Sequence, residues 1–74
     1  RQGKWAAAEG QFRRAVEIQT AAVTALPSDH ELKRDLAATH LALGVVLDDL
    51  GRLNEAEGQF RTALALRLGL TTTH

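Results

Sequence analysis

Two segments of the chain repeat each other at a separation of 48 residues, and this repeat limits the possible fold more than any other feature. Residues 9–13 and 57–61 both read EGQFR. The same shift superimposes small residues, namely Gly3 on Gly51, Ala8 on Ala56 and Ala15 on Ala63. A repeat of this length is typical of units that stack on their neighbours to bury a shared core. We therefore interpret the 74 residues as the second half of one unit followed by one complete unit.

Both copies have the hydrophobic spacing of a helix. In the first copy, apolar residues follow one another at steps of three or four, as at Trp5, Ala8, Phe12 and Ala15. This spacing places them on one helical face, and alanine and leucine, both good helix formers, are frequent throughout the chain. We predict helices over residues 4–25, 29–50 and 53–70. The expected fold is all-α, with three antiparallel helices in a single unit spanning residues 1–74.

The helix boundaries are predicted from the capping residues. Pro27 ends the first helix because it has no N–H and disfavours helical dihedrals at the residue before it. Ser28, with an acidic residue three positions later, has the capping-box spacing for the second helix, and Asn54 has it for the third. Gly51 is expected to end the second helix in a left-handed conformation.

Two features inside the helices affect how they pack. Apolar residues occupy most of the circumference of the second helix between Leu36 and Leu50, which predicts that it is buried on more than one side. Gly10 and Gly58 occur at equivalent positions of the two copies, in mid-helix, where glycine costs about 1 kcal/mol relative to alanine. We expect them to permit a close approach of two backbones.

The composition argues against several classes of function. Nine basic and nine acidic residues cancel, so there is no electrostatic footprint for nucleic acid and no attraction to an anionic membrane surface. No apolar run approaches the roughly 18 residues of a membrane span. The sequence has no cysteine, which favours a cytoplasmic location. We find no nucleophile–base arrangement and no glycine-rich phosphate loop, and we expect neither an enzyme nor a bound cofactor.

The two ends of the sequence suggest a piece of a longer array. The chain begins without methionine or a signal-peptide pattern, and it stops one residue before the counterpart of Pro27. We therefore expect further repeats beyond it.

The titratable residues do not form a reactive group in the sequence. His30 and His40 are ten positions apart and point to different sides of a helix, and His74 lies in the tail, so we predict no metal site, a packed His40 and two solvated histidines. Asp48 and Asp49 are adjacent and diverge on a helix, which favours a solvated rim over an acid–base pair. The basic pairs at residues 13–14 and 33–34 are interpreted as solvated faces with local acidic partners.

The complete unit resembles the tetratricopeptide repeat. The residues that carry the resemblance are Leu43, Gly44, Leu47, Gly51, Ala56, Phe60 and Ala63, and the first copy matches through Gly3, Ala8, Phe12, Ala15 and Pro27. The long repeat period of 48 residues, together with sequence segments such as KRDLA at residues 33–37, is similar to the long-helix variants common in bacterial multi-repeat proteins. The sequence departs from the pattern at His40, Leu47 and Leu68, where tryptophan, tyrosine and proline are usual.

The resemblance implies a solenoid of helical hairpins that serves as a non-catalytic protein–protein interaction module or scaffold. It implies packing between helices through ten residues: Trp5, Ala8, Phe12, Ala15, Leu43, Gly44, Leu47, Ala56, Phe60 and Ala63. It also implies a partner groove on the second helix lined by six residues: Ala38, Leu41, Ala42, Val45, Asp48 and Asp49.

Apolar residues in this groove disfavour one known mode of recognition. Leu41, Ala42 and Val45 stand where repeats that clamp a peptide carboxylate have asparagine and lysine. The expected occupant is therefore an apolar partner helix or peptide, or else neighbouring repeats or a second copy of the chain. The alternative function is a self-assembling structural protein that forms a homo-oligomer or filament through the same surface.

Overall fold

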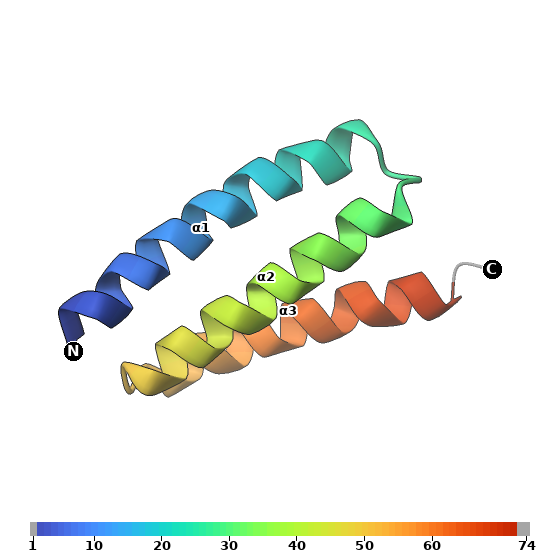
Figure 1. The fold of residues 1–74 in the computed structure, drawn as a ribbon. Helices are drawn as coiled ribbons and strands as arrows, with labels where there is room; N and C mark the ends of the chain where they lie inside the picture. Colours follow the sequence, from blue (N-terminus) through green and yellow to red (C-terminus); the bar gives the residue numbers. More distant parts are fainter. Residues whose placement is uncertain (1, 73–74) are drawn as a thin grey trace.

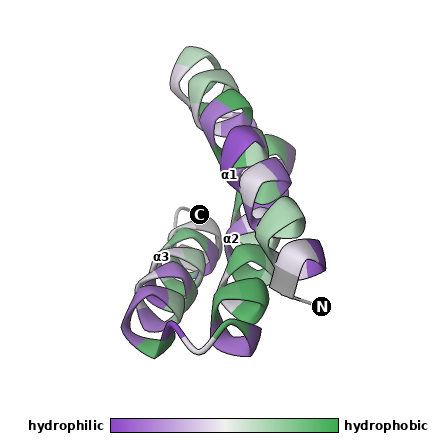
Figure 2. Cartoon of the chain, turned by 90° about the vertical axis from the view of Figure 1, so that its left-hand side faces the viewer, coloured by the Kyte–Doolittle hydropathy of each residue, from purple (hydrophilic) through white to green (hydrophobic). Residues whose placement is uncertain are grey.

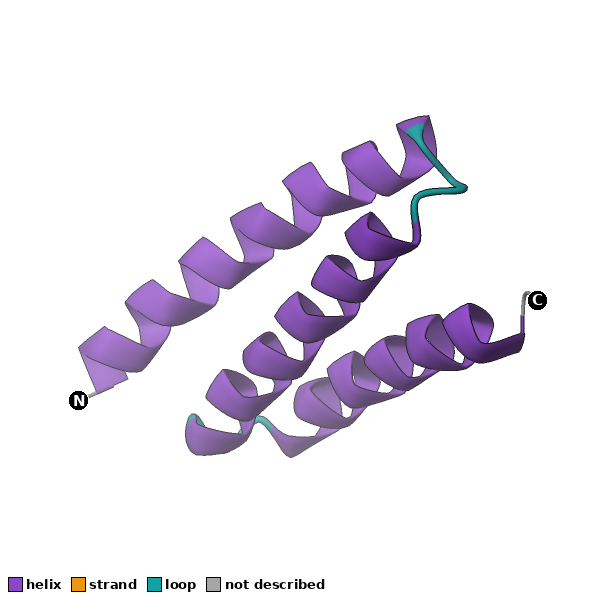
Figure 3. Ribbon diagram, turned by 45° about the vertical axis from the view of Figure 1, so that its right-hand side comes forward, coloured by secondary structure: helices purple, strands orange, loops and turns teal. Residues whose placement is uncertain are grey.

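The computed structural model describes residues 2–72, and it describes the side-chain surroundings of residues 3–69. The chain forms α1 (Gln2–Ala25), α2 (His30–Asp49) and α3 (Leu53–Thr72). Two short connections join the helices, and residues 2–72 contain no strand (Figures 1 and 3). The prediction of an all-α fold with three antiparallel helices is confirmed. The helix ends differ from the predicted ones by about one or two residues, the usual spread at helix termini.

The second helix is central to the arrangement, because α2 lies between α1 and α3 and packs against both (Figure 2). The Cα atoms extend over 42 × 20 × 13 Å. Part of the surface of α2, which includes the exposed Ala38 and Val45, is covered by neither neighbour.

The core draws on all three helices. Leu43 and Leu47 of α2 and Ala56 of α3 form a buried cluster, and Phe12 and Val16 of α1 pack against it. Burial of one leucine side chain contributes about 1.5–3 kcal/mol. Leu43 and Leu47 are almost completely inaccessible to solvent and are the largest fully buried side chains, so they contribute most to the stability of the core.

The connection between α1 and α2 differs from the prediction. Asp29, not Ser28, is the N-cap of α2, and its carboxylate accepts hydrogen bonds from the backbone N–H groups of Glu31 (3.0 Å) and Leu32 (3.1 Å). The N–H of Asp29 donates to the carbonyl of Leu26 at 3.0 Å, which closes a turn over Pro27 and Ser28. Ser28 therefore lies within the turn, one residue before the position from which it could cap the helix.

The connection between α2 and α3 confirms one prediction and corrects another. Gly51 has φ 81°, the left-handed conformation expected of it. Its N–H donates to the carbonyl of Asp48, and the N–H of Arg52 donates to that of Leu47, both at 2.9 Å, so the end of α2 is closed by hydrogen bonds. The N–H of Ala56 donates to the carbonyl of Arg52 at 3.0 Å. Asn54 is consequently inside α3, and its predicted capping role is wrong.

The two equivalent glycines do not mark close contacts between helices. A Cβ atom added at Gly10 or Gly58 would meet no heavy atom within 4 Å. The expected close backbone approach at these positions is therefore wrong. A different glycine, Gly44, has that role.

Candidate functional site

One face of α2 remains accessible after α1 and α3 have covered the rest of the helix. The buried residues of α2 are Leu36, Ala37, His40, Leu43, Gly44, Val46 and Leu47. The six predicted groove residues lie elsewhere on the circumference: Ala38, Val45, Asp48 and Asp49 are exposed, and Leu41 and Ala42 are half-buried. At about 3.6 residues per turn, their spacing follows one side of the helix. We call this set of six residues the α2 face.

The α2 face is apolar along most of its length and acidic at one end. Val45 lies at its centre and is 52% exposed. Asp48 and Asp49 follow in the last turn of α2, where the backbone carbonyls already concentrate negative charge, and this turn contains no basic residue. The face therefore offers an apolar strip that leads to a site of negative potential.

The position of α3 behind this face depends on Gly44. A Cβ atom at this position would lie 2.5 Å from Cε1 of Phe60, so the aromatic ring occupies the space that any larger residue would need. Phe60 nevertheless retains 36% exposure, which means that only part of the ring is covered by α2. Among the glycines of residues 3–69, Gly44 alone faces such a contact.

A buried polar pair supplements the apolar contacts between α2 and α3. His40 is 9% exposed, and its Nδ1 donates a hydrogen bond of 2.6 Å to the side-chain oxygen of Gln59. The amide oxygen only accepts, so the hydrogen resides on Nδ1. The prediction of a packed His40 is confirmed, but its partner was not predicted from the sequence. His30 is exposed, and His74 lies outside the described residues.

Four charged side chains connect the start of α3 to α1. Glu9 accepts from Arg13 at 2.9 Å and from Arg52 at 2.7 Å, Arg52 also contacts Glu55 at 2.7 Å, and Arg13 reaches Glu55 at 3.4 Å. We call these four residues the charge cluster. The hydrogen bonds from Arg13 and Arg52 lower the pKa of Glu9, and that from Arg52 lowers the pKa of Glu55. The hydrogen bonds that Arg52 donates to Glu55 and Glu9 raise the pKa of Arg52, so these contacts favour the charged forms of Glu9, Arg52 and Glu55.

Only part of this charge cluster was predicted from the sequence. The local partner of Arg13 was expected, whereas the contacts to Arg52 and Glu55 join residues more than 40 positions apart. The available signal was the Glu–x3–Arg spacing that occurs in both copies, at residues 9–13 and 57–61. The second pair, Arg61 with Glu57, also forms, at 3.0 Å.

The predicted packing residues are covered to different extents. Ala56 and Ala63 of α3 are buried, whereas their counterparts Ala8 and Ala15 on α1 are half-buried, and Trp5 is 37% exposed. The difference follows from position, because α3 packs on α2 through its alanine side, while the equivalent side of α1 has no preceding helix against it. Trp5 therefore contributes less to the packing than its size suggested.

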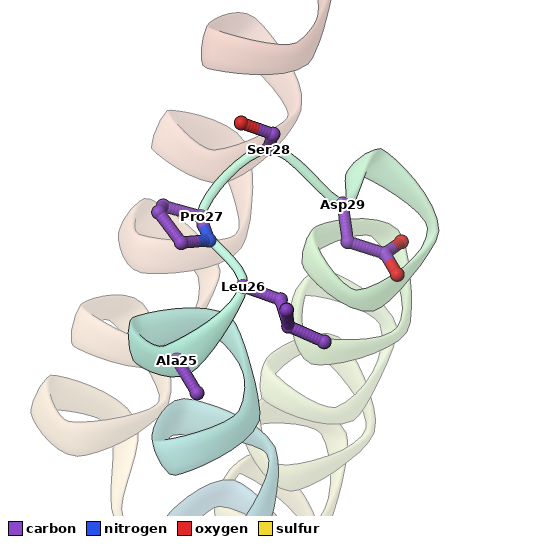
Figure 4. Close-up of a pocket in the computed structure, with 5 residues that line it drawn as sticks. All are labelled: Ala25, Leu26, Pro27, Ser28 and Asp29. Carbon is purple, nitrogen blue, oxygen red and sulfur yellow. The ribbon is translucent and has the colours of Figure 1, made fainter.

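Two hollows formed by described residues lie beside these features. One, of about 390 Å³, is formed by residues 25–29 at the connection between α1 and α2, and its sole titratable side chain, Asp29, already caps α2 (Figure 4). The other, of about 200 Å³, lies between the three helices beside His40. Within the described residues, no three histidine or acidic side chains lie close enough together to hold a metal ion.

Comparison with known families identifies the second hairpin. Residues 36–68, which include most of α2 and most of α3, match the family model described as tetratricopeptide repeat. This segment is therefore a tetratricopeptide repeat, and the resemblance seen in the sequence is confirmed. Such repeats are protein-interaction folds and are generally non-catalytic. Neither the curated proteins nor the solved structures gave a match to the chain. In the part of the chain that the structure describes, no helix combines the length and apolarity needed to span a bilayer.

Proposed function

We propose that this tetratricopeptide repeat is a non-catalytic module that binds a protein segment on the α2 face. The observation that supports the proposal most directly is the exposure of Val45, at 52%, on a helix whose other sides are buried. Exposed apolar strips with a polar border mark interaction sites more often than isolated exposed aliphatic residues do. The cytoplasmic location expected from the absence of cysteine belongs to the same proposal.

The chemistry of the α2 face defines the kind of segment that fits it. An apolar stretch, as a helix or an extended peptide, would cover Leu41, Ala42 and Val45. A lysine or arginine beyond that stretch would lie near Asp48 and Asp49, where the end of α2 adds to the negative potential. The proposed partner is therefore a segment with an apolar centre and a basic end.

A second function, self-assembly through the same face, is favoured by the distribution of charge along α2. Arg34 is exposed near the start of this helix, and Asp49 is exposed near its end. If two copies packed their α2 faces in antiparallel orientation, Arg34 of each copy would lie near Asp49 of the other. This arrangement is isologous, so it produces a closed dimer.

Light scattering coupled to size-exclusion chromatography distinguishes the two functions. A chain that is monomeric across micromolar concentrations excludes self-assembly. Association that is lost in Val45→Asp supports it, because the substitution places a charge in the centre of the apolar strip. The matched control is Ile18→Asp, which alters a 64% exposed side chain on α1 at a similar cost in helix propensity and should leave association unchanged.

The binding function is tested with synthetic helical peptides. One fluorescent peptide carries an apolar i, i+3, i+4, i+7 stripe followed by two lysines, and a second carries two glutamates instead. Fluorescence anisotropy should detect binding of the lysine peptide alone, and the double variant Asp48→Asn, Asp49→Asn should remove the difference. Equal binding of both peptides, or binding of neither by a monomeric chain, would contradict the proposal.

A further inference from the structure

The smaller of the two hollows, which we call the three-helix hollow, is separate from the α2 face. Its volume is about 200 Å³, and its lining residues are Arg13, Val16 and Glu17 of α1, His40 and Leu43 of α2, and Gln59 of α3. At about 30 Å³ for each water molecule, it holds roughly six or seven waters. Pockets for drug-sized ligands usually measure about 300–1,000 Å³. The three-helix hollow therefore suits one side chain rather than a cofactor.

His40 presents a hydrogen-bond acceptor without a partner to this hollow. The residue is 9% exposed, and its Nδ1 donates to the side-chain oxygen of Gln59. With the hydrogen on Nδ1, the second ring nitrogen, Nε2, is an acceptor. Among the described residues no group donates to Nε2, and this atom is not one of the fully buried polar atoms that lack a partner. Nε2 therefore keeps access to the open space that His40 lines.

Glu17 adds a negative charge that no described side chain neutralises. It is exposed, and it takes part in none of the ion pairs within residues 3–69. The other charged lining residue, Arg13, already contacts Glu9 at 2.9 Å and Glu55 at 3.4 Å. The charge cluster contains two arginines and two glutamates, so its formal charges cancel. The uncompensated charge of the three-helix hollow is therefore the Glu17 carboxylate.

Between these polar groups, the wall of the three-helix hollow is apolar. Leu43 is 1% exposed and belongs to the core cluster, and the half-buried Val16 packs against that cluster. Such a wall suits lysine and arginine, because their apolar stems cover it while their charged ends reach polar groups. Two acceptors in different places favour arginine, since a guanidinium group has five N–H donors in a planar fork. It is also more weakly hydrated than an ammonium group.

We propose that the three-helix hollow binds an arginine side chain of a partner protein segment. The guanidinium group donates hydrogen bonds to the Glu17 carboxylate and to Nε2 of His40, and the methylene stem covers Val16 and Leu43. An acidic side chain is a poor occupant, because Glu17 repels it and Arg13 is already paired. This site does not include the α2 face and does not depend on the function proposed above.

The proposal is tested by nuclear magnetic resonance on the complete chain. The probe is Nα-acetyl-arginine amide, whose capped ends leave the guanidinium as its only charge. Saturable shifts of the backbone amide signals of Val16, Glu17 and His40 are expected at millimolar concentrations. The control is Nα-acetyl-citrulline amide, which has a similar shape and no charge, and it should bind about fivefold more weakly, because hydrogen bonds between charged groups are stronger. Equal binding of the two probes would overturn the proposal.

A pair of charge variants locates the arginine probe. Glu17→Gln should weaken its binding about two- to fivefold, the range of an exposed ion pair. Glu31→Gln makes the same change at an exposed position of α2 outside the hollow, and it should leave binding unchanged. Equal binding by both variants would overturn the proposal. Shifts at Asp48 and Asp49 without shifts at Glu17 would also overturn it, because the probe would then occupy the α2 face, and the function proposed above would be unaffected.

The role of His40 is measured at its ring nitrogens. In a long-range proton–nitrogen correlation spectrum, the Nε2 signal should move as the arginine probe is added, whereas Nδ1 should stay protonated. An Nε2 signal that is unchanged at saturation would overturn the assignment of His40 as the second acceptor. Nα-acetyl-lysine amide tests the choice of side chain and should bind more weakly than the arginine probe. Equal or tighter binding of the lysine probe would overturn the choice of arginine.

Discussion

The ring of Phe60 occupies the space in which Gly44 would otherwise carry a side chain. A Cβ atom at residue 44 would lie 2.5, 2.8 and 3.0 Å from three ring carbons, distances that side chains do not reach without displacement. Since the aromatic ring is rigid, relief requires a new rotamer of Phe60 or a larger separation of α2 and α3. The contact thus sets the distance between the two helices of the repeat.

We predict that Gly44→Ala lowers the free energy of unfolding by about 1 kcal/mol. Overpacking costs about 1–3 kcal/mol, and the better helix propensity of alanine returns about 1 kcal/mol. Thermal unfolding measured by circular dichroism gives the change. Combining the substitution with Phe60→Leu should recover part of the loss, because the smaller side chain frees the space.

The matched controls for this prediction are Gly10→Ala and Gly58→Ala. Both positions are open, so only the gain in propensity should remain, and each variant should be more stable by about 0.5–1 kcal/mol. A loss of stability in either control would show that these glycines have contacts absent from the structure. Equal effects at residues 44 and 58 would contradict the role assigned to Phe60.

We predict that Asp29→Ala destabilises the chain by about 1 kcal/mol, whereas Ser28→Ala changes its stability little. Asp29 accepts two backbone hydrogen bonds at the start of α2, and removal of such a cap costs about 0.5–2 kcal/mol. Ser28 is exposed in the turn. The thermal midpoint of the Asp29 variant should fall by about 4–8 °C. If Ser28→Ala were the more destabilising of the two variants, Ser28 and not Asp29 would be the N-cap of α2.

We predict that Gln59→Leu costs about 1–3 kcal/mol, because it leaves the Nδ1–H group of the buried His40 without an acceptor. Urea unfolding monitored by circular dichroism provides the measurement. Gln11→Leu is the control, since Gln11 is the equivalent residue of the first copy and is exposed. If both variants retained the stability of the parent chain, the hydrogen bond of His40 would contribute nothing measurable.

We predict a loss of stability in acid that depends on the charge cluster. The pKa values of Glu9 and Glu55 lie below the ordinary 4.5 of a glutamate side chain in the folded state, so unfolding raises them. The unfolded chain therefore binds more protons, and stability falls as the pH drops from 4.5 through the lower folded-state values. Above pH 4.5 both carboxylates make their full contribution to the free energy of unfolding. The raised pKa of Arg52 has no effect in this range, because the guanidinium remains charged.

Thermal midpoints of the parent chain and Glu9→Gln, measured from about pH 7 to pH 2.5, test this prediction. The parent should be the more stable above pH 4.5, and the difference should disappear in acid. Glu17→Gln makes the same change in net charge outside the cluster and is the control for that change. A difference between the parent and Glu9→Gln that is constant with pH would rule out the ion pairs of Glu9 as its cause.

The local elements of this fold were predictable because their causes lie within a few residues of each other. Three- and four-residue spacing of apolar side chains defines each helix. Gly51 follows the last residues of a helix, where glycine commonly adopts the left-handed conformation that the structure shows. Placement of the N-cap was wrong by one residue because Ser28 and Asp29 both have capping side chains. The choice between them depends on the turn closed by the Leu26 carbonyl.

The contacts between helices were less predictable. Phe60 was expected to pack against other helices, yet the sequence did not show that its ring meets Gly44 while 36% of it stays exposed. Gly10 and Gly58 carried the same apparent signal of close approach, and they face open space. Which glycine meets a neighbour depends on how far each helix is rotated about its axis, and that rotation follows from all the packing contacts together.

By itself, the sequence determined three helices, their order, the turn at Gly51 and the correspondence between Glu9–Arg13 and Glu57–Arg61, because backbone hydrogen bonding and side-chain spacing are local. Only the tertiary structure decided that Arg52 and Glu55 complete the first of these pairs and that Gln59 is the partner of His40. It also decided that Val45 remains exposed. These relationships arise only when helices distant in the sequence are set side by side at one separation and one rotation.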